Sequence, residues 1–171
     1  VDTQQHVNPE FWAAFAPAMI ARAKAKGIPN FHLFGEVFTE DLDPARLAVH
    51  TRVDKMPFVI DYAFRRAMLD TVGGTAGPEE LVRLFKADPL YEGGAQATLG
   101  MPTFISNHDA GRFGYYVRKA FPNATDAEIL KRVKLGHAML FGLRGVPVVY
   151  AGDEQGFAGE GGDQDAREDM F

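Results

Sequence analysis

Three acidic residues, Asp2, Glu36 and Asp109, stand where a short apolar run ends or would end. Glu36 comes just after the run FHLF at 31–34, and Asp109 follows the run TFI at 103–105. Asp2 would hold the same place if a strand comes directly before it. Because the carboxyl ends of parallel strands lie at one edge of a sheet, we expect the three side chains to converge. Two carboxyl groups facing each other suit glycoside hydrolysis, and a third can orient the sugar and raise the pKa of the acid.

Each of these features has an ordinary structural explanation when it is taken alone. A single Glu after a strand most often forms a salt bridge or caps a helix. The stretch SNHD at 106–109 fits an Asx turn, and GDE at 152–154 fits a simple turn. His6 lies one helical turn after Asp2, so a local hydrogen bond explains it as well as a substrate contact does.

A metal site is a further interpretation of the same residues. His6, Glu36, His108 and Asp109 carry the imidazole and carboxylate groups that bind zinc or manganese. No pair of histidines has helical spacing such as HExxH, which weighs against this interpretation.

The elements that must position the acids show alternating strand-like and helical patterns. Short apolar runs that are typical of strands buried on both faces lie at 31–34, 56–60, 103–105 and 146–150. Helical patterns with stop or capping signals lie at 8–26, 44–51, 61–71, 78–86 and 125–142. Thr125 and Glu128 fit a capping box. This alternation predicts an α/β fold with a parallel sheet and right-handed crossovers.

The spacing of the acids agrees with a (β/α)8 barrel, which uses roughly 31 residues for each of its units. Asp2 and Glu36 are 34 residues apart, Glu36 and Asp109 are 73 apart, and Asp109 and Tyr150 are 41 apart. These separations correspond to one unit, two units and one unit. The spacing alone gives the relative order of the strands and not their numbers in a barrel.

Composition excludes several classes of function. The formal net charge is -5, and nothing resembles the basic stripe that nucleic-acid binding requires. The most apolar stretch, 133–151, is interrupted by charged residues and Pro147, so we expect no membrane-spanning segment. The chain contains no cysteine, which excludes disulfides and thiolate metal sites.

Four stretches, VDTQQH, FGEVF, FISNHD and GVPVVYAGDE, together resemble successive signature regions of the α-amylase family, glycoside hydrolase family 13. The tail GDQDAREDMF resembles the loop after the eighth strand of some bacterial members. The resemblance implies part of a (β/α)8 TIM barrel, from approximately the end of strand 4 through strand 8. Residues 1–171 would then be a single partial domain, the C-terminal half of the catalytic barrel.

The same resemblance implies roles for particular residues. Asp2 would be the nucleophile, Glu36 the general acid and base, and Asp109 the third acid that stabilises the transition state. Among substrate-binding residues, it implies His108 at the cleavage subsite and His6 and Gln5 near the acceptor subsite, and it adds Asn107 without a subsite. Gln5 stands where many starch-cleaving members have Lys. The reaction would retain the anomeric configuration.

The family's motif before the nucleophile, Gly-Phe-Arg, would precede Val1, so we expect the sequence to begin inside a motif. We therefore expect the isolated chain to be inactive, and to bind the missing N-terminal half-barrel or to self-associate through exposed sheet edges. The resemblance implies no required cofactor, a structural calcium in the intact protein with most ligands elsewhere, and a secreted or periplasmic location.

The predicted activity is cleavage of α-1,4-glucosidic bonds of starch or maltooligosaccharides by the intact protein. A transglycosylase or an α-glucosidase of the same family would use the same three acids. A non-catalytic glucan-binding or assembly module is the alternative from another class, although such relatives usually lose one or more of the acids.

Overall fold

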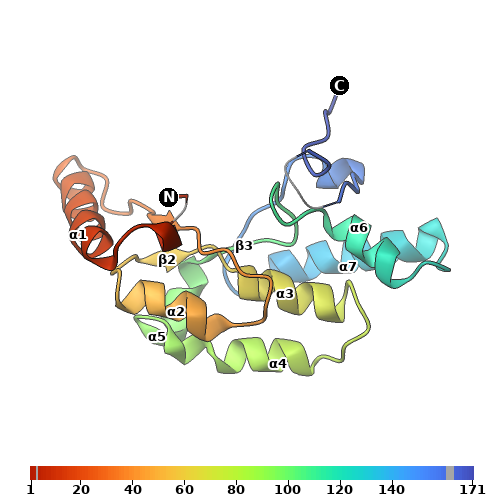
Figure 1. The fold of residues 1–171 in the computed structure, drawn as a ribbon, viewed down its shortest axis with the longest axis horizontal. Helices are drawn as coiled ribbons and strands as arrows, with labels where there is room; N and C mark the ends of the chain where they lie inside the picture. Colours follow the sequence, from red (N-terminus) through yellow and green to blue (C-terminus); the bar gives the residue numbers. More distant parts are fainter. Residues whose placement is uncertain (3, 161–163) are drawn as a thin grey trace.

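The computed structural model describes residues 1–2, 4–160 and 164–171, and shows short parallel strands separated along the chain by helices (Figure 1). The strands are β1 (Phe34–Gly35), β2 (Phe58–Val59), β3 (Pro102–Thr103) and β4 (Val146–Pro147). β1 pairs with β2, and β3 pairs with β4, both in parallel. A parallel bridge between Asp61 and Thr103 joins the two pairs. The order of the strands in space is therefore their order along the chain.

Val1 extends this arrangement on the other side of β1. Its carbonyl oxygen accepts a hydrogen bond from the backbone N–H of Glu36 at 2.8 Å. Its amino group donates to the carbonyl of Phe34 at 2.6 Å. Asp2 therefore lies beside the end of β1, as the spacing predicts.

The helices confirm the predicted pattern and add to it. The α-helices are α1 (Pro9–Ala25), α2 (Pro44–Arg52), α3 (Tyr62–Thr71), α4 (Glu79–Lys86), α5 (Gly94–Ala97), α6 (Phe113–Ala120) and α7 (Asp126–Gly142). The 3-10 helices are η1 (Gln4–His6), η2 (Asp88–Leu90), η3 (Thr98–Gly100) and η4 (Asp153–Gln155). The five predicted helices correspond to α1 to α4 and α7, each with its ends within one residue of the prediction. α6 was not predicted, because its first residue follows Arg112, which provides no side-chain cap.

Side-chain caps fix where two of the central helices begin. Asp61 accepts a hydrogen bond from the backbone N–H of Phe64 at 2.8 Å, which starts α3 directly after β2. The predicted capping box at the start of α7 is confirmed, since Thr125 and Glu128 each bond the backbone of the other. The other oxygen of Asp61 pairs with Arg144 at 2.7 Å, so the start of α3 is also tied to the residues before β4.

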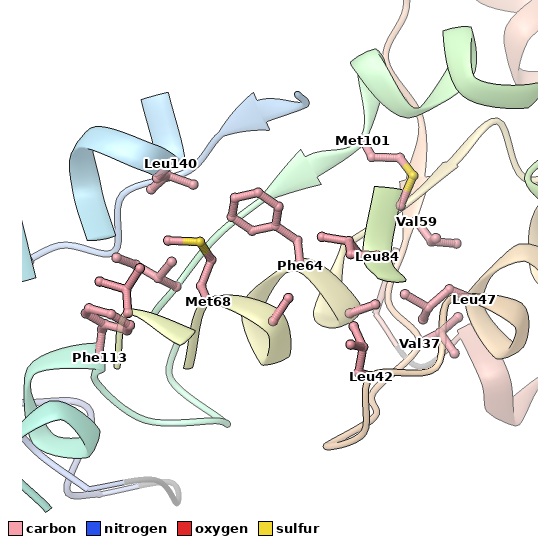
Figure 2. Packing of buried hydrophobic residues seen from close by; sticks show 14 of the residues in the cluster. Val37, Leu42, Leu47, Val59, Phe64, Met68, Leu84, Met101, Phe113 and Leu140 are labelled. Atoms are coloured by element: carbon pink, nitrogen blue, oxygen red, sulfur yellow. The ribbon is translucent and has the colours of Figure 1, made fainter. Parts of the chain in front are cut away.

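The main core lies between the sheet and the helices that follow it (Figure 2). Phe64 and Met68 of α3 pack there with Leu84 of α4 and Leu140 of α7, and each of these side chains is fully buried. α3 therefore has helices or strands around most of its surface. This makes its first turn a firm support for residues at the end of β2.

The strand predictions were correct in position and too long, and the predicted burial is confirmed at 103–105 and wrong at 31–34 and 146–150. The runs at 56–60 and 146–150 each contain two residues paired as a strand, and the runs at 31–34 and 103–105 each contain one. The segment 146–150 is not buried on both faces, because Val146, Val148 and Val149 are 44%, 46% and 41% exposed. The physical reason is that β4 pairs with β3 alone among the described residues, so its other side lacks a neighbour.

Candidate active site

The three predicted acids line one cavity. Asp2, Glu36 and Asp109 share a cavity of about 310 Å³, and its other lining residues are Gln5, His6 and Phe38. Val1, β1 and β3 bring these residues together from positions more than 100 residues apart in the chain. Of the seven residues predicted to act in catalysis or substrate binding, five lie on this wall, and the other two, Asn107 and His108, flank Asp109 in sequence.

Asp2 is positioned by the 3-10 helix η1 that follows it. Gln4 is fully buried, and its amide donates to Asp54 at 2.8 Å. The indole N–H of Trp12 donates to the Gln4 carbonyl at 2.9 Å. Gly35 leaves the space for this arrangement, since a Cβ there would be 2.6 Å from Cδ of Gln4. Position 35 must therefore be glycine because the side chain of Gln4 fills the space beside it.

Gln5 and His6 lie on the cavity wall beside Asp2. The side-chain oxygen of Gln5 accepts a hydrogen bond from Arg46 at 3.4 Å in an exposed position. His6 is exposed. Both residues are placed where an incoming sugar or water could meet them, and their role in binding stays a prediction.

Glu36 follows β1 and is held at both its backbone and its side chain. Its N–H bonds Val1, and its carboxylate oxygen Oε1 accepts a hydrogen bond from the hydroxyl of Tyr62 at 2.9 Å. Burial raises the pKa of Glu36, and the negative charges of Asp2 and Asp109 raise it further, while the bond from Tyr62 opposes them. A carboxyl group in this environment keeps its proton to a higher pH, as a general acid must.

Tyr62 is a site residue that the sequence analysis missed. It is 1% exposed, and its ring packs edge-on against those of Phe38 and Phe104, with distances between ring centroids of 5.1 Å and 4.9 Å. Its hydroxyl accepts a hydrogen bond from the amide of Asn107 at 2.9 Å. The signal was present, because Tyr62 comes just after the apolar run 56–60, at the position where the other strands carry their acids. Burial, and then the charge of Glu36, raises the pKa of Tyr62.

The loop 106–112 after β3 carries Asp109 and is held by bonds inside it. The side chain of Asn107 accepts a hydrogen bond from the backbone N–H of Ala110, three residues later, at 2.7 Å. The ring of His108 lies 3.1 Å from a carboxylate oxygen of Asp109. The oxygen of the Asn107 side chain thus bonds Ala110, and its nitrogen bonds Tyr62. Contacts of Asn107 and His108 with a sugar stay predictions.

Arg112 fastens this loop to the C-terminal segment. Its guanidinium, 1% exposed, pairs with Asp153 at 3.0 Å and with Glu168 at 2.8 Å. It also lies 4.2 Å from the centre of the Tyr150 ring. The GDE motif and the tail motif thus supply partners for Arg112, although positions 161–163, where the tail motif begins, lie outside the described residues.

The metal interpretation finds no support in the described part of the chain. No group of three or more His, Asp or Glu side chains there could hold a metal ion. His6, Glu36, His108 and Asp109 do not form such a group, and no residues described here fit the implied calcium as a set of carboxylate ligands.

Across the described residues, no helix has the length and apolar character needed to cross a bilayer.

Comparison with known proteins identifies the family of this chain. The family described as "Alpha amylase, catalytic domain" matches residues 2–170. The chain belongs to the alpha-amylase family. Among curated members it is 37% identical, over its whole length, to an alpha-amylase of Streptomyces lividans, and 32% identical over 99% of its length to a beta/alpha-amylase of Paenibacillus polymyxa. It spans 18% and 12% of the lengths of these two alpha-amylase family proteins.

Solved structures of alpha-amylases match the fold. An alpha-amylase of Anoxybacillus matches 99% of the chain with a TM-score of 0.80 and 28% identity, and the chain covers 34% of it. An alpha-amylase of Geobacillus thermoleovorans, solved with acarbose, matches 98% with a TM-score of 0.78 and 25% identity, and 35% of it is covered. The predicted fold class, part of a (β/α)8 barrel, is thereby confirmed.

Proposed function

We propose that the protein carrying these residues is a retaining glycoside hydrolase that cleaves α-1,4-glucosidic bonds of starch or maltooligosaccharides. The observation that carries the proposal is the convergence of Asp2, Glu36 and Asp109 on one cavity, with a pKa of Glu36 raised by burial and by the two other acids. The names of the relatives, alpha-amylases of Streptomyces lividans and Geobacillus thermoleovorans, support the same substrate class.

In the first step of this proposal, the carboxylate of Asp2 attacks the anomeric carbon while Glu36 donates its proton to the glycosidic oxygen. The bond between the sugar and its leaving group breaks, and a covalent glycosyl ester forms on Asp2. In the second step, Glu36 takes a proton from water, the water oxygen attacks the same carbon, and Asp2 leaves as a carboxylate. Two inversions at one carbon give net retention.

Asp109 acts in this proposal as a fixed negative charge. It raises the pKa of Glu36, and its carboxylate lies on the cavity wall where it can accept hydrogen bonds from sugar hydroxyls. The ring of His108, 3.1 Å from Asp109, gives that carboxylate a fixed partner. We place His6 and Gln5, on the wall next to Asp2, at the side where the acceptor sugar or water enters.

The rest of the barrel forms a second part of the proposal. Phe34, Ile60, Phe104 and Val148 line a mostly apolar cavity of about 260 Å³ together with Glu36 and Asn107. The chain covers only 34% of the Anoxybacillus alpha-amylase that it matches. We propose that the remaining barrel strands of a longer chain cover this face, and that the 171 residues alone are inactive and self-associate. Light scattering that finds a stable monomer of these residues would contradict this proposal.

Two further properties are proposed from the family resemblance alone. The intact protein would act outside the cytoplasm, where polymeric glucans are found, and a structural calcium would take its ligands mainly from outside these residues. No catalytic step depends on that ion.

The test uses the longest natural chain that contains residues 1–171, acting on maltoheptaose. Because general acid catalysis contributes about 10² to 10⁴ in rate, we expect Glu36→Gln to reduce kcat/KM by about a thousandfold. Glu92→Gln, at an exposed position, is the matched control and should keep full activity. Proton NMR of the first products should show the α-anomer. Products that appear first as the β-anomer, or equal activity of the two variants, would show the proposal to be wrong.

A further inference from the structure

A continuous series of hydrogen bonds joins the loop after β3 to the acid after β1. The backbone N–H of Ala110 bonds Oδ1 of Asn107 at 2.7 Å. Nδ2 of Asn107 bonds the Tyr62 oxygen at 2.9 Å, and the Tyr62 hydroxyl bonds Oε1 of Glu36 at 2.9 Å. The series crosses from β3 through the first residue of α3 to the residue after β1.

The chemistry of the groups fixes the direction of every bond in this series. A backbone N–H can only donate, so the side-chain atom of Asn107 that faces Ala110 must be its oxygen. The amide nitrogen of Asn107 then faces Tyr62 and can only donate, so the Tyr62 oxygen accepts. The single hydroxyl hydrogen of Tyr62 is thereby left for Glu36.

We propose that Tyr62 is a positioning residue for Glu36: its hydroxyl holds Oε1 as a hydrogen-bond acceptor, and Asn107 fixes the direction of that hydroxyl. The proton that the acid transfers is then carried by the other oxygen, Oε2. This inference rests on the proposed function, in which Glu36 is the general acid. It adds Tyr62 to that function and names Oε2 as the oxygen of Glu36 that carries the transferred proton.

The surroundings of Tyr62 support a positioning role over contact with the sugar. Its side chain is 1% exposed and is absent from the cavity wall formed by the three acids. Phe38 and Phe104 hold the ring on two sides. The bond from Tyr62 lowers the pKa of Glu36 against the upward effect of burial, so the contact acts on the ionised form as well.

The experiment is the pH dependence of kcat/KM for Tyr62→Phe, measured on maltoheptaose with the longest natural chain. The basic limb of this profile reports the pKa of the acid in the free enzyme. Removing a donor to the carboxylate raises that pKa, so we expect the limb to move up by about one pH unit. We expect kcat to fall about tenfold because the carboxyl loses its fixed orientation. KM should change less, since Tyr62 does not reach the cavity.

Tyr91→Phe is the matched control. Tyr91 is 3% exposed, and its hydroxyl has no hydrogen-bond partner among the described residues, so its removal should leave the pH profile unchanged. If Tyr62→Phe does not fold, as judged by circular dichroism, Asn107→Asp carries the test. In that variant the second carboxylate oxygen accepts the hydrogen of Tyr62 and turns it away from Glu36, so the basic limb should again move up and kcat should fall.

The outcomes separate this inference from the proposed function. If Glu36→Gln is inactive while Tyr62→Phe, or Asn107→Asp in its place, keeps the basic limb and kcat of the unsubstituted enzyme, Glu36 is the acid and the role given to Tyr62 is wrong. If Glu36→Gln is as active as Glu92→Gln, the proposed function itself is wrong, and this inference is overturned with it.

Discussion

Replacing Gly35 by Ala tests whether Asp2 and Glu36, the proposed nucleophile and general acid, share one packing arrangement. The added Cβ would be 2.6 Å from Cδ and 3.2 Å from Cβ of Gln4, a side chain with no exposed surface. Gln4 must therefore leave its place and give up its hydrogen bond to Asp54, which keeps only His50 at 2.7 Å. Because Gln4 is two residues after Asp2, this movement displaces η1 and Asp2 with it.

The expected magnitude follows from two effects. Overpacking a core position destabilises by about 1 to 3 kcal/mol. Losing a hydrogen bond to a charged group adds about 1.5 to 3 kcal/mol, with the lower end expected here because His50 still contacts Asp54. We therefore expect Gly35→Ala to reduce the free energy of unfolding by about 3 kcal/mol. Gly142→Ala is the matched control, since nothing lies within 4 Å of a Cβ at that position in α7.

Urea denaturation of the single variants, of Gln4→Ala and of the double variant gives a thermodynamic cycle. Gln4→Ala removes the side-chain amide that a methyl group at position 35 would meet, so the loss in the double variant should be smaller than the sum of the single losses by about 1 kcal/mol or more. Gly142→Ala should change stability by less than about 1 kcal/mol, in the stabilising direction, because Ala favours helix. Additive losses, or equal effects of Gly35→Ala and Gly142→Ala, would refute the reasoning.

Two further predictions concern the C-terminal segment. Arg112→Met leaves Asp153 and Glu168 without their buried partner and should reduce the free energy of unfolding by about 3 kcal/mol. Arg118→Met, the control, breaks an exposed ion pair and should reduce it by less than about 1 kcal/mol. Equal losses of the two variants in urea denaturation would contradict this prediction. Asp153, 3.7 Å from the ring of His137, raises the pKa of that histidine above its ordinary 6.5. The stabilising effect of the protonated His137 is therefore complete below pH 6.5 and is lost as the pH rises through the higher folded pKa, so stability should fall above pH 6.5 by more than it does in His137→Gln. Equal pH dependence of the two proteins would contradict it.

The sequence predicted the parts of the site that follow a repeated rule. Glu36 and Asp109 come two and four residues after apolar runs, and the parallel sheet brings the ends of those runs together. Helices with clear stop and capping signals were placed within one residue, because these signals are local. The capping box of Thr125 and Glu128 is an example.

Residues that act through partners far along the chain were not predicted. Arg112 pairs with Glu168, 56 positions later, and nothing near Arg112 in the sequence indicates that partner. The exposure of Val148 and Val149 depends on whether β4 has a second neighbour, which no local pattern can report. Tyr62 differs from these cases, since the rule that found Glu36 applies to it as well. Its aromatic side chain carries no charge at neutral pH and so did not suggest chemistry.

The order of the strands has a consequence for how the protein folds during synthesis. Each strand pairs with the one made just before it, β2 with β1 and β4 with β3, and the bridge at Asp61 links the middle pair. A strand emerging from the ribosome therefore finds its neighbour already made, and the sheet can grow one unit at a time. The ion pair between Asp61 and Arg144 joins residues 83 positions apart, so it can form only after α7 and Arg144 have emerged, just ahead of β4. We expect this pair to form after β1 to β3 have assembled, and to hold the chain at Arg144 close to the sheet as β4 pairs with β3.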